Sequence, residues 1–161
     1  MKKILIITFL IISFLIPSQT KAVEQGNGLE VKSPNLYVDI IILNPREAED
    51  LSLNEELLRS KVELALRQND INILNEFSII YPYNLNIYLD VIGNDYFKAF
   101  NIAINFQREV KYYNKNIDYR TAGITWIRSI TGVTSDQKLI LDKLKNAVDI
   151  FINEFHKSNN F

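Results

Sequence analysis

Carboxylates are the side chains in this sequence whose number and placement come closest to supporting catalysis. Four of them lie in or beside a stretch that alternates apolar and polar residues: Asp90, Asp95, Glu109 and Asp118. Two acids held about 5–10 Å apart can hydrolyse a glycosidic bond. Asp95 and Asp118 stand in or beside turn segments, where Asp is common for backbone reasons. We therefore expect surface and turn roles for these acids, and a protein that is not an enzyme.

Other catalytic chemistry lacks the residues that it needs. His156 is the only histidine, and it stands near the expected end of a C-terminal helix, close to water. The chain has no cysteine, which removes thiol, zinc–thiolate and iron–sulfur chemistry. It also lacks a Gly-x-Ser-x-Gly elbow, a phosphate-binding glycine loop and a dinucleotide fingerprint. We expect no catalytic residue, no metal site and no cofactor.

The N-terminal segment predicts export. Met1–Lys3 is positive, Ile4–Ile16 is apolar, Pro17 follows, and Thr20–Ala22 has the small-residue pattern of a cleavage site. A membrane anchor is the competing interpretation, but the apolar run falls short of the roughly 20 residues that span a bilayer. We expect a signal peptide over 1–22, cleavage after Ala22, a periplasmic or secreted protein, and no stable membrane anchor.

Charge and length limit the partners and the number of domains. The net charge of −1 becomes −4 when Lys2, Lys3 and Lys21 leave with the signal peptide. Nucleic acid or anionic membrane partners favour clustered Lys and Arg, so we expect neither. The sequence predicts a flexible, glycine-containing leader over 23–34 and a single domain over 35–158, large enough for one core. Without disulfides, that core depends on packing alone.

A meander of three antiparallel strands is expected between Leu85 and Gly132. Alternate residues in each strand form an apolar row, which predicts one buried face. The rows are Leu85, Ile87, Leu89 and Val91; Phe100, Ile102, Ile104 and Phe106; and Ala122, Ile124, Trp126 and Ile130. The residues between them are small, hydroxylic or amide-bearing, so the other face can meet water. Gly93–Asp95 and Asn114–Asn116 supply the turns.

One further strand and two helices complete the fold. Leu36–Leu43 is apolar apart from Asp39, which indicates an interior strand. A helix is expected from near Ser52, where Ser52 and Glu55 match a capping box.

A second helix is expected after Gly132, with Thr134 and Gln137 as its capping pair. Its apolar stripe is Ile140, Leu144, Ala147, Val148, Phe151 and Phe155. The predicted fold is an α+β two-layer sandwich of order β-α-β-β-β-α, with a mainly antiparallel sheet and both helices on one face.

Several segments resemble a widespread group of small exported bacterial proteins of uncharacterised function. They are Ser52–Leu74, Tyr83–Ile87, Gly123–Trp126, Thr131–Gly132 and Val148–Asp149 with Phe151 and Phe155. The element order is similar to that of the amino-terminal domain of the Tol-system periplasmic propeller protein and of the lipopolysaccharide-assembly lipoprotein. The resemblance implies an envelope component that docks to other proteins, although fold does not determine function. The chain has no cysteine for lipid attachment, unlike the lipoprotein.

The open sheet face is the expected binding surface. Its candidate residues are Tyr88, Asn101, Asn105, Gln107, Thr121 and Thr125. Tyr81, Tyr83, Tyr112, Tyr113 and Tyr119 cluster at the strand ends, where they suit protein or glycan contacts or simply reflect the high strand propensity of tyrosine. We expect an interaction module that docks to an envelope protein through this face or an exposed sheet edge. The alternative is an amphiphile or glycan bound between helices and sheet, in a cavity lined by Phe100, Ile104, Trp126 and Phe151.

Overall fold

The computed structural model describes residues 28–76, 83–94, 96–114 and 117–159, and for residues 111–119 within these ranges it describes the backbone alone. The expected signal peptide, residues 1–22, and the first part of the expected leader lie outside the described residues. Tyr81 and Asp95 lie outside them too.

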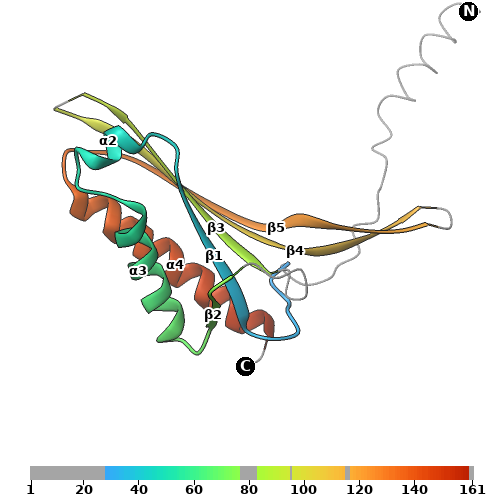
Figure 1. Ribbon diagram of the computed structural model, residues 1–161. Coiled ribbons are helices and arrows are strands. Elements are labelled where there is room, and N and C mark those ends of the chain that lie inside the picture. The colour runs from blue at the N-terminus through green and yellow to red at the C-terminus, as the bar shows by residue number, and fades with distance from the viewer. Residues whose placement is uncertain (1–27, 77–82, 95, 115–116, 160–161) are drawn as a thin grey trace, which may run out of the picture.

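The described chain forms two layers, a sheet and a pair of long helices (Figure 1). The strands are β1 (Asn35–Ile42), β2 (Asn72–Leu74), β3 (Asn84–Gly93), β4 (Lys98–Asn114) and β5 (Ile117–Thr134). They lie in the order β2-β1-β3-β4-β5. The helices are α2 (Pro45–Glu49), α3 (Glu55–Arg67) and α4 (Gln137–Asn159). The expected α+β sandwich is confirmed, and α2 and β2 are additions to the expected order.

The sheet is mostly antiparallel because its long ladders join β3 to β4 and β4 to β5. β1 lies between β2 and β3 and pairs in parallel with both, so its interior position is confirmed for Asn35–Tyr37, the residues that pair with β2. Pairing between β3 and β4 stops at Gln107, and the rest of β4 continues with β5 as a two-stranded arm that projects beyond the helices (Figure 1).

The core lies between α3, α4 and the apolar rows of β3 and β4. Ile102 and Ile104 are 2% and 0% exposed, as the strand alternation predicts. The ring of Phe106 lies 5.8 Å from that of Phe151 and 6.2 Å from that of Phe155, both on α4. Trp126, on β5, meets Phe151 edge to face. Aromatic side chains of α4 therefore pack against both β4 and β5.

Both helices begin later than the expected capping pairs place them. Asn54 is the N-cap of α3, and its Oδ1 accepts a hydrogen bond from the Leu57 amide at 2.8 Å. Ser52 has a φ of 55° and lies in the preceding turn, so the predicted Ser52 cap is wrong. The Thr134 hydroxyl accepts from the Asp136 amide instead of capping α4. An Asx or ST turn competes locally with a capping box for the same side chains.

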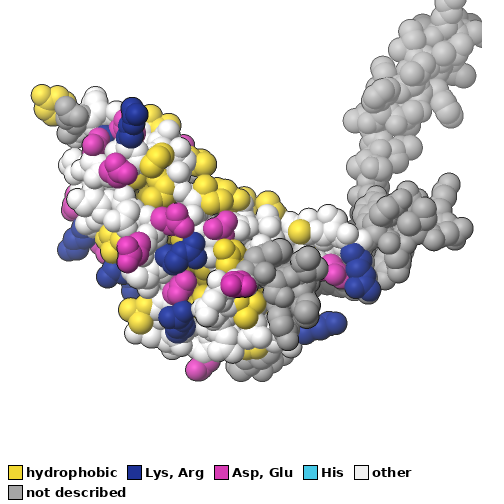
Figure 2. All heavy atoms as spheres, viewed as in Figure 1, with side chains coloured by type: hydrophobic (Ala, Val, Ile, Leu, Met, Phe, Trp, Pro, Cys, Tyr) yellow, Lys and Arg dark blue, Asp and Glu magenta, His cyan; other side chains and the backbone are white. Residues whose placement is uncertain are grey.

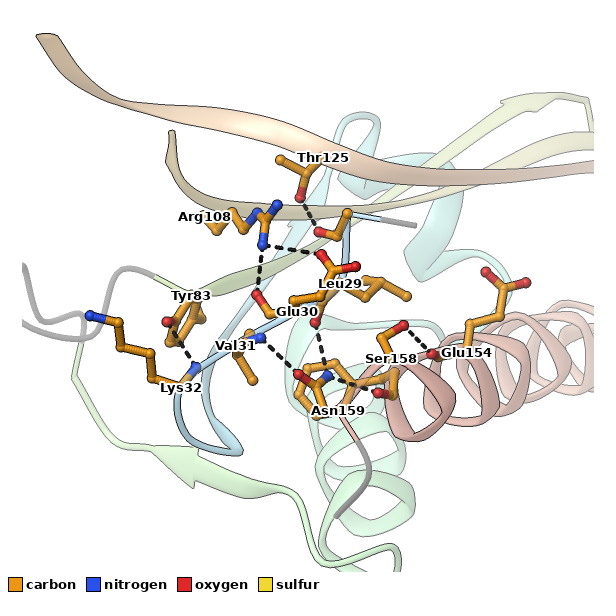
Figure 3. A network of polar contacts seen from close by, with 12 residues as sticks. Leu29, Glu30, Val31, Lys32, Tyr83, Arg108, Thr125, Glu154, Ser158 and Asn159 are labelled. Atoms are coloured by element: carbon orange, nitrogen blue, oxygen red, sulfur yellow. Dashed lines mark hydrogen bonds and ion pairs between the residues drawn. The ribbon is translucent and has the colours of Figure 1, made fainter. Parts of the chain in front are cut away.

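The second part of the expected flexible leader, residues 28–34, is packed onto the domain (Figure 3). Leu29 is fully buried, and Asn159 at the end of α4 donates to the Leu29 carbonyl and accepts from the Val31 amide. Arg108 donates to the carbonyl of Glu30 and forms an ion pair with its carboxylate at 3.2 Å. The segment is polar and has no periodic pattern, so the sequence did not predict these long-range contacts. The ordered domain therefore begins earlier than expected.

Helix α2 is fastened to the sheet by a buried lysine. The Nζ of Lys98, at the start of β4, lies 2.5 Å from a Glu47 oxygen and 2.7 Å from an Asp50 oxygen. Lys98 is only 5% exposed. Hydrogen bonds and charge from Asp50 and Glu47 raise the pKa of Lys98 above its usual value of 10.5. A buried ammonium is tolerated here because it has two carboxylate partners.

Lys98→Met should lower the midpoint of thermal unfolding at neutral pH, because the carboxylates of Glu47 and Asp50 lose their cation. A raised pKa in the folded state means that the stabilisation is present below pH 10.5 and disappears as the pH rises above it. The difference in stability between the two proteins should therefore shrink on the alkaline side. Chemical denaturation at a series of pH values measures it, and a difference that does not change with pH would contradict the role of the charge.

Leu29→Ala should destabilise the domain by about 2–5 kcal/mol, the usual range for truncating a fully buried leucine. Lys32→Ala is the matched control, because the Lys32 side chain is exposed and a surface substitution should change stability by no more than about 0.5 kcal/mol. Urea unfolding measures both. Equal, small effects would mean that residues 28–34 do not contribute to the core.

Candidate interaction surface

Four of the six expected binding residues share the sheet face that the helices leave uncovered, which we call the open face. Strand register places Tyr88 opposite Ala103, Asp90 opposite Asn101, Asn86 opposite Asn105 and Asn84 opposite Gln107. These pairs alternate with the buried pairs of the core, as the period of a strand requires. Tyr88, Asn101, Asn105 and Gln107 therefore lie on one continuous surface.

A bulge in β5 removes the other two expected residues from this surface. Phe106 pairs with Trp126 and Gln107 pairs with Ile124, so Thr125 is an extra residue between them. The Thr125 hydroxyl donates to the Gly28 carbonyl at 2.5 Å.

Beyond the bulge, Thr121 pairs with Val110 and so lies on the opposite face of the hairpin from Gln107. The expected places of Thr121 and Thr125 are therefore wrong, because the prediction assumed unbroken alternation.

The open face is partly apolar, and the bulge contributes one of its apolar side chains. Ile124, expected on the helix side, lies opposite Gln107 and is 53% exposed. Ile127 lies opposite Asn105 and is 63% exposed, and Val133 at the end of the strand is 62% exposed. Figure 2 shows hydrophobic side chains gathered along the concave upper margin of the molecule. Sequence reasoning missed Ile127 and Val133. The signal was the adjacent pair Trp126–Ile127, which breaks strict alternation.

Amide side chains occupy the centre of the open face. Asn84, Asn86, Asn105 and Gln107 form two neighbouring cross-strand pairs. Asn86 and Asn105 are only 6% and 9% exposed. The Oδ1 atoms of Asn84 and Asn105 are buried, and neither has a hydrogen-bond partner among the described residues. Buried acceptors without donors are costly, so this region favours contact with a group that donates hydrogen bonds.

The sheet has two long edges, and they differ in how well they are protected against pairing with a further strand. Beyond Tyr37, β1 has no pairing with β2, and there Arg59 of α3 donates to the Val38 carbonyl at 2.6 Å. Arg59 also lies 3.9 Å from Asp39. The other edge is β5, which pairs with β4 and with no further described strand. It has no proline, and Arg128 is the only charged residue between Thr121 and Thr134. Charges, proline and covering elements are how natural sheets block pairing. From Thr121 to Thr134, β5 has one charge and no proline, and the segment at Gly28 contacts it at Thr125.

The space between helices and sheet is filled at the residues expected to line a ligand cavity. Phe100, Ile104 and Phe151 are each no more than 3% exposed. A Cβ on Gly132 would lie 2.6 Å from the Phe100 ring, so the glycine allows this ring to lie flat on β5. Trp126 donates its indole N–H to a Glu154 oxygen at 2.7 Å. Packing and a hydrogen bond account for these side chains.

The acids considered for catalysis have structural partners where they are described. Asp90 accepts a hydrogen bond from the side-chain amide of Asn44 at 2.6 Å, and Glu109 forms an ion pair with Arg120 at 3.4 Å. The side chain of Asp118 is not described. Across the described ranges, no group of three or more His, Asp or Glu side chains is placed to share a metal ion. None of the helices in those ranges has the length and apolar character needed to cross a bilayer.

No protein-family model matches the chain, and no curated protein shows significant similarity to it.

Replacing Ile124 and Ile127 together by Thr should change the free energy of unfolding by less than about 1 kcal/mol, because both side chains are exposed. Ile102→Ala, in the buried row of the same sheet, should cost about 2–5 kcal/mol. Urea unfolding compares the two proteins. A loss of several kcal/mol in the Ile124/Ile127 variant would mean that these residues are covered, contrary to the register described above.

Proposed function

We propose that this protein is a non-enzymatic interaction module of the bacterial cell envelope, which docks to a protein partner by accepting a strand on the edge of β5. One observation carries the proposal. β5 is an edge strand of 18 residues with no further described strand beside it, and its open-face residues Ile124, Ile127 and Val133 are each more than half exposed. The resemblance to exported envelope proteins agrees with such a role.

Strand addition fits this edge physically. Main-chain hydrogen bonds along an exposed strand supply affinity, and alternate side chains of the added strand supply specificity. The partner segment should be extended, and every second side chain should be apolar where it lies beside Ile124 and Ile127. The buried amide oxygens of Asn84 and Asn105 are two strands or fewer from this edge. A polar group of the partner that reaches them would gain hydrogen bonds that the free protein lacks.

Other interpretations have less support. An amphiphile or glycan between helices and sheet needs space that Phe100 and Phe151 occupy. A carboxylate-based enzyme needs two free acids, whereas Asp90 and Glu109 are engaged by Asn44 and Arg120.

Photo-crosslinking at β5 tests the proposal. Because the chain has no cysteine, a single cysteine at Ile127 can carry a benzophenone label without competing sites. In envelope extract we expect one discrete adduct. Mass spectrometry identifies the crosslinked partner peptide, which should belong to an extended segment with alternating apolar residues. Adding Ile124→Lys to the labelled protein should weaken the complex by about tenfold or more, because the substitution places a charge in an apolar contact.

The matched control is a labelled cysteine at Lys143, an exposed position on α4. It should give no adduct with the same partner. Adducts of equal yield from both positions, or an Ile127 adduct that Ile124→Lys does not reduce, would overturn strand addition at β5.

A further inference from the structure

The outer surface of the helix layer has a groove that the docking surface does not use. It lies between α3 and α4 and has a volume of about 350 Å³. Its floor is made by Val62, Leu144 and Val148, each at most 4% exposed. The volume is at the lower end of the range of about 300–1,000 Å³ that small-molecule sites occupy. The groove is therefore large enough for a small ligand.

The two helices run in the same direction along this groove. β1 and β5 are both parallel to β3, as the chain of strand pairings requires, and α3 and α4 each return antiparallel to the strand before them. The Gln137 side chain at the start of α4 donates to the Ser52 carbonyl just before α3, at 2.8 Å. The lining residues extend over 61–68 and 138–148, which is about 10 Å on α3 and about 15 Å on α4 at 1.5 Å per residue.

The rim of the groove is basic. Lys61 contributes from α3, and Lys138 and Lys145 from α4, against a single lining carboxylate, Asp142. Lys145 forms an ion pair with Asp149 at 2.6 Å. The salt bridges of the described residues include neither Lys61 nor Lys138. The sequence as a whole has one more acid than base. The groove is lined by three lysines and one carboxylate, and because Lys145 is paired with Asp149, the local excess of positive charge comes from Lys61 and Lys138.

We propose that this groove binds an anionic single-chain amphiphile, specifically a medium-chain fatty acid. The aliphatic chain would lie along Leu64, Ala65 and Leu141, the lining residues whose apolar side chains are partly or more than half exposed, and it would remove that surface from water. Its carboxylate would meet Lys61 and Lys138, whose ammonium groups supply charge-assisted hydrogen bonds. The volume of about 350 Å³ fits a single aliphatic chain better than a partner helix about 10 Å across with its side chains. A two-chain lipid would likewise leave one chain outside.

This inference is independent of the proposed docking function. The groove is built by the helices, whereas Ile124 and Ile127 lie on the face of the sheet that the helices do not cover. Failure of fatty acid binding would leave strand addition at β5 untouched, and the converse also holds.

Calorimetric titration of the exported protein with decanoate below its micelle concentration tests the site. Decyltrimethylammonium and decyl maltoside, with the same chain length and different head groups, are the ligand controls. We expect saturable binding of decanoate and at least about tenfold weaker binding of the other two. Equal affinity for all three would overturn recognition of the anion, and lack of saturable decanoate binding would overturn the site.

Two lysine pairs serve as matched variants. Lys61→Ala with Lys138→Ala should weaken decanoate binding by about tenfold, whereas Lys143→Ala with Lys157→Ala should change it by less than about twofold. Lys143 and Lys157 are also exposed on α4 but do not line the groove, so the pairs remove equal charge. Equal losses would show a general charge effect and overturn the site.

Ala65→Phe, which places a ring in the groove, should abolish decanoate binding with unchanged circular dichroism. If this variant does not fold, the two lysine pairs still test the site, because all four lysines are exposed and their replacement should leave the fold intact.

Discussion

The contact between α4 and the central antiparallel strands is the interaction on which this domain depends. Phe151 and Phe155 of α4 meet Phe106 of β4 at 5.8 and 6.2 Å, and all three are fully buried. Because the chain has no cysteine, no disulfide can limit the unfolded state, and burial of apolar surface must supply most of the stability. One layer of helices can cover one face of a sheet. The opposite face is consequently left open to other contacts.

Polar contacts hold the ends of several helices and strands in place. Lys98 holds α2 to the start of β4 through Glu47 and Asp50. Asn159, the last residue of α4, ties that helix to the segment around Leu29, and Thr125 ties Gly28 to the bulge of β5. Each anchor joins segments far apart in the sequence. The chain therefore enters the fold beside the strand that we propose as the docking edge.

The two edges of the sheet differ in how well they are protected against pairing with another strand. Arg59 occupies the backbone acceptor of Val38 on the β1 side, whereas the β5 side carries Ile124 and Ile127 in exposed positions. A protein that avoided association altogether would be expected to blunt both edges. The bulge at Thr125 increases the twist of β5 locally, and it also places Ile124 on the open face. One irregularity in a ladder thus adds an apolar side chain to the open face.

The sequence by itself determined the layers of this protein. Alternation in β3 and β4 and the helical stripe of α4 are local patterns, and they identified the buried rows, the sandwich and four of the open-face residues. Tertiary structure alone decided the strand order, the insertion of α2, the anchoring of Leu29 and the bulge that moves Ile124, Thr121 and Thr125 from their expected places. These features depend on contacts between distant segments, such as Lys98 with Glu47 or Asn159 with Leu29. A period of two along one strand carries no information about such contacts, because it reports which side a residue faces only while the register is unbroken.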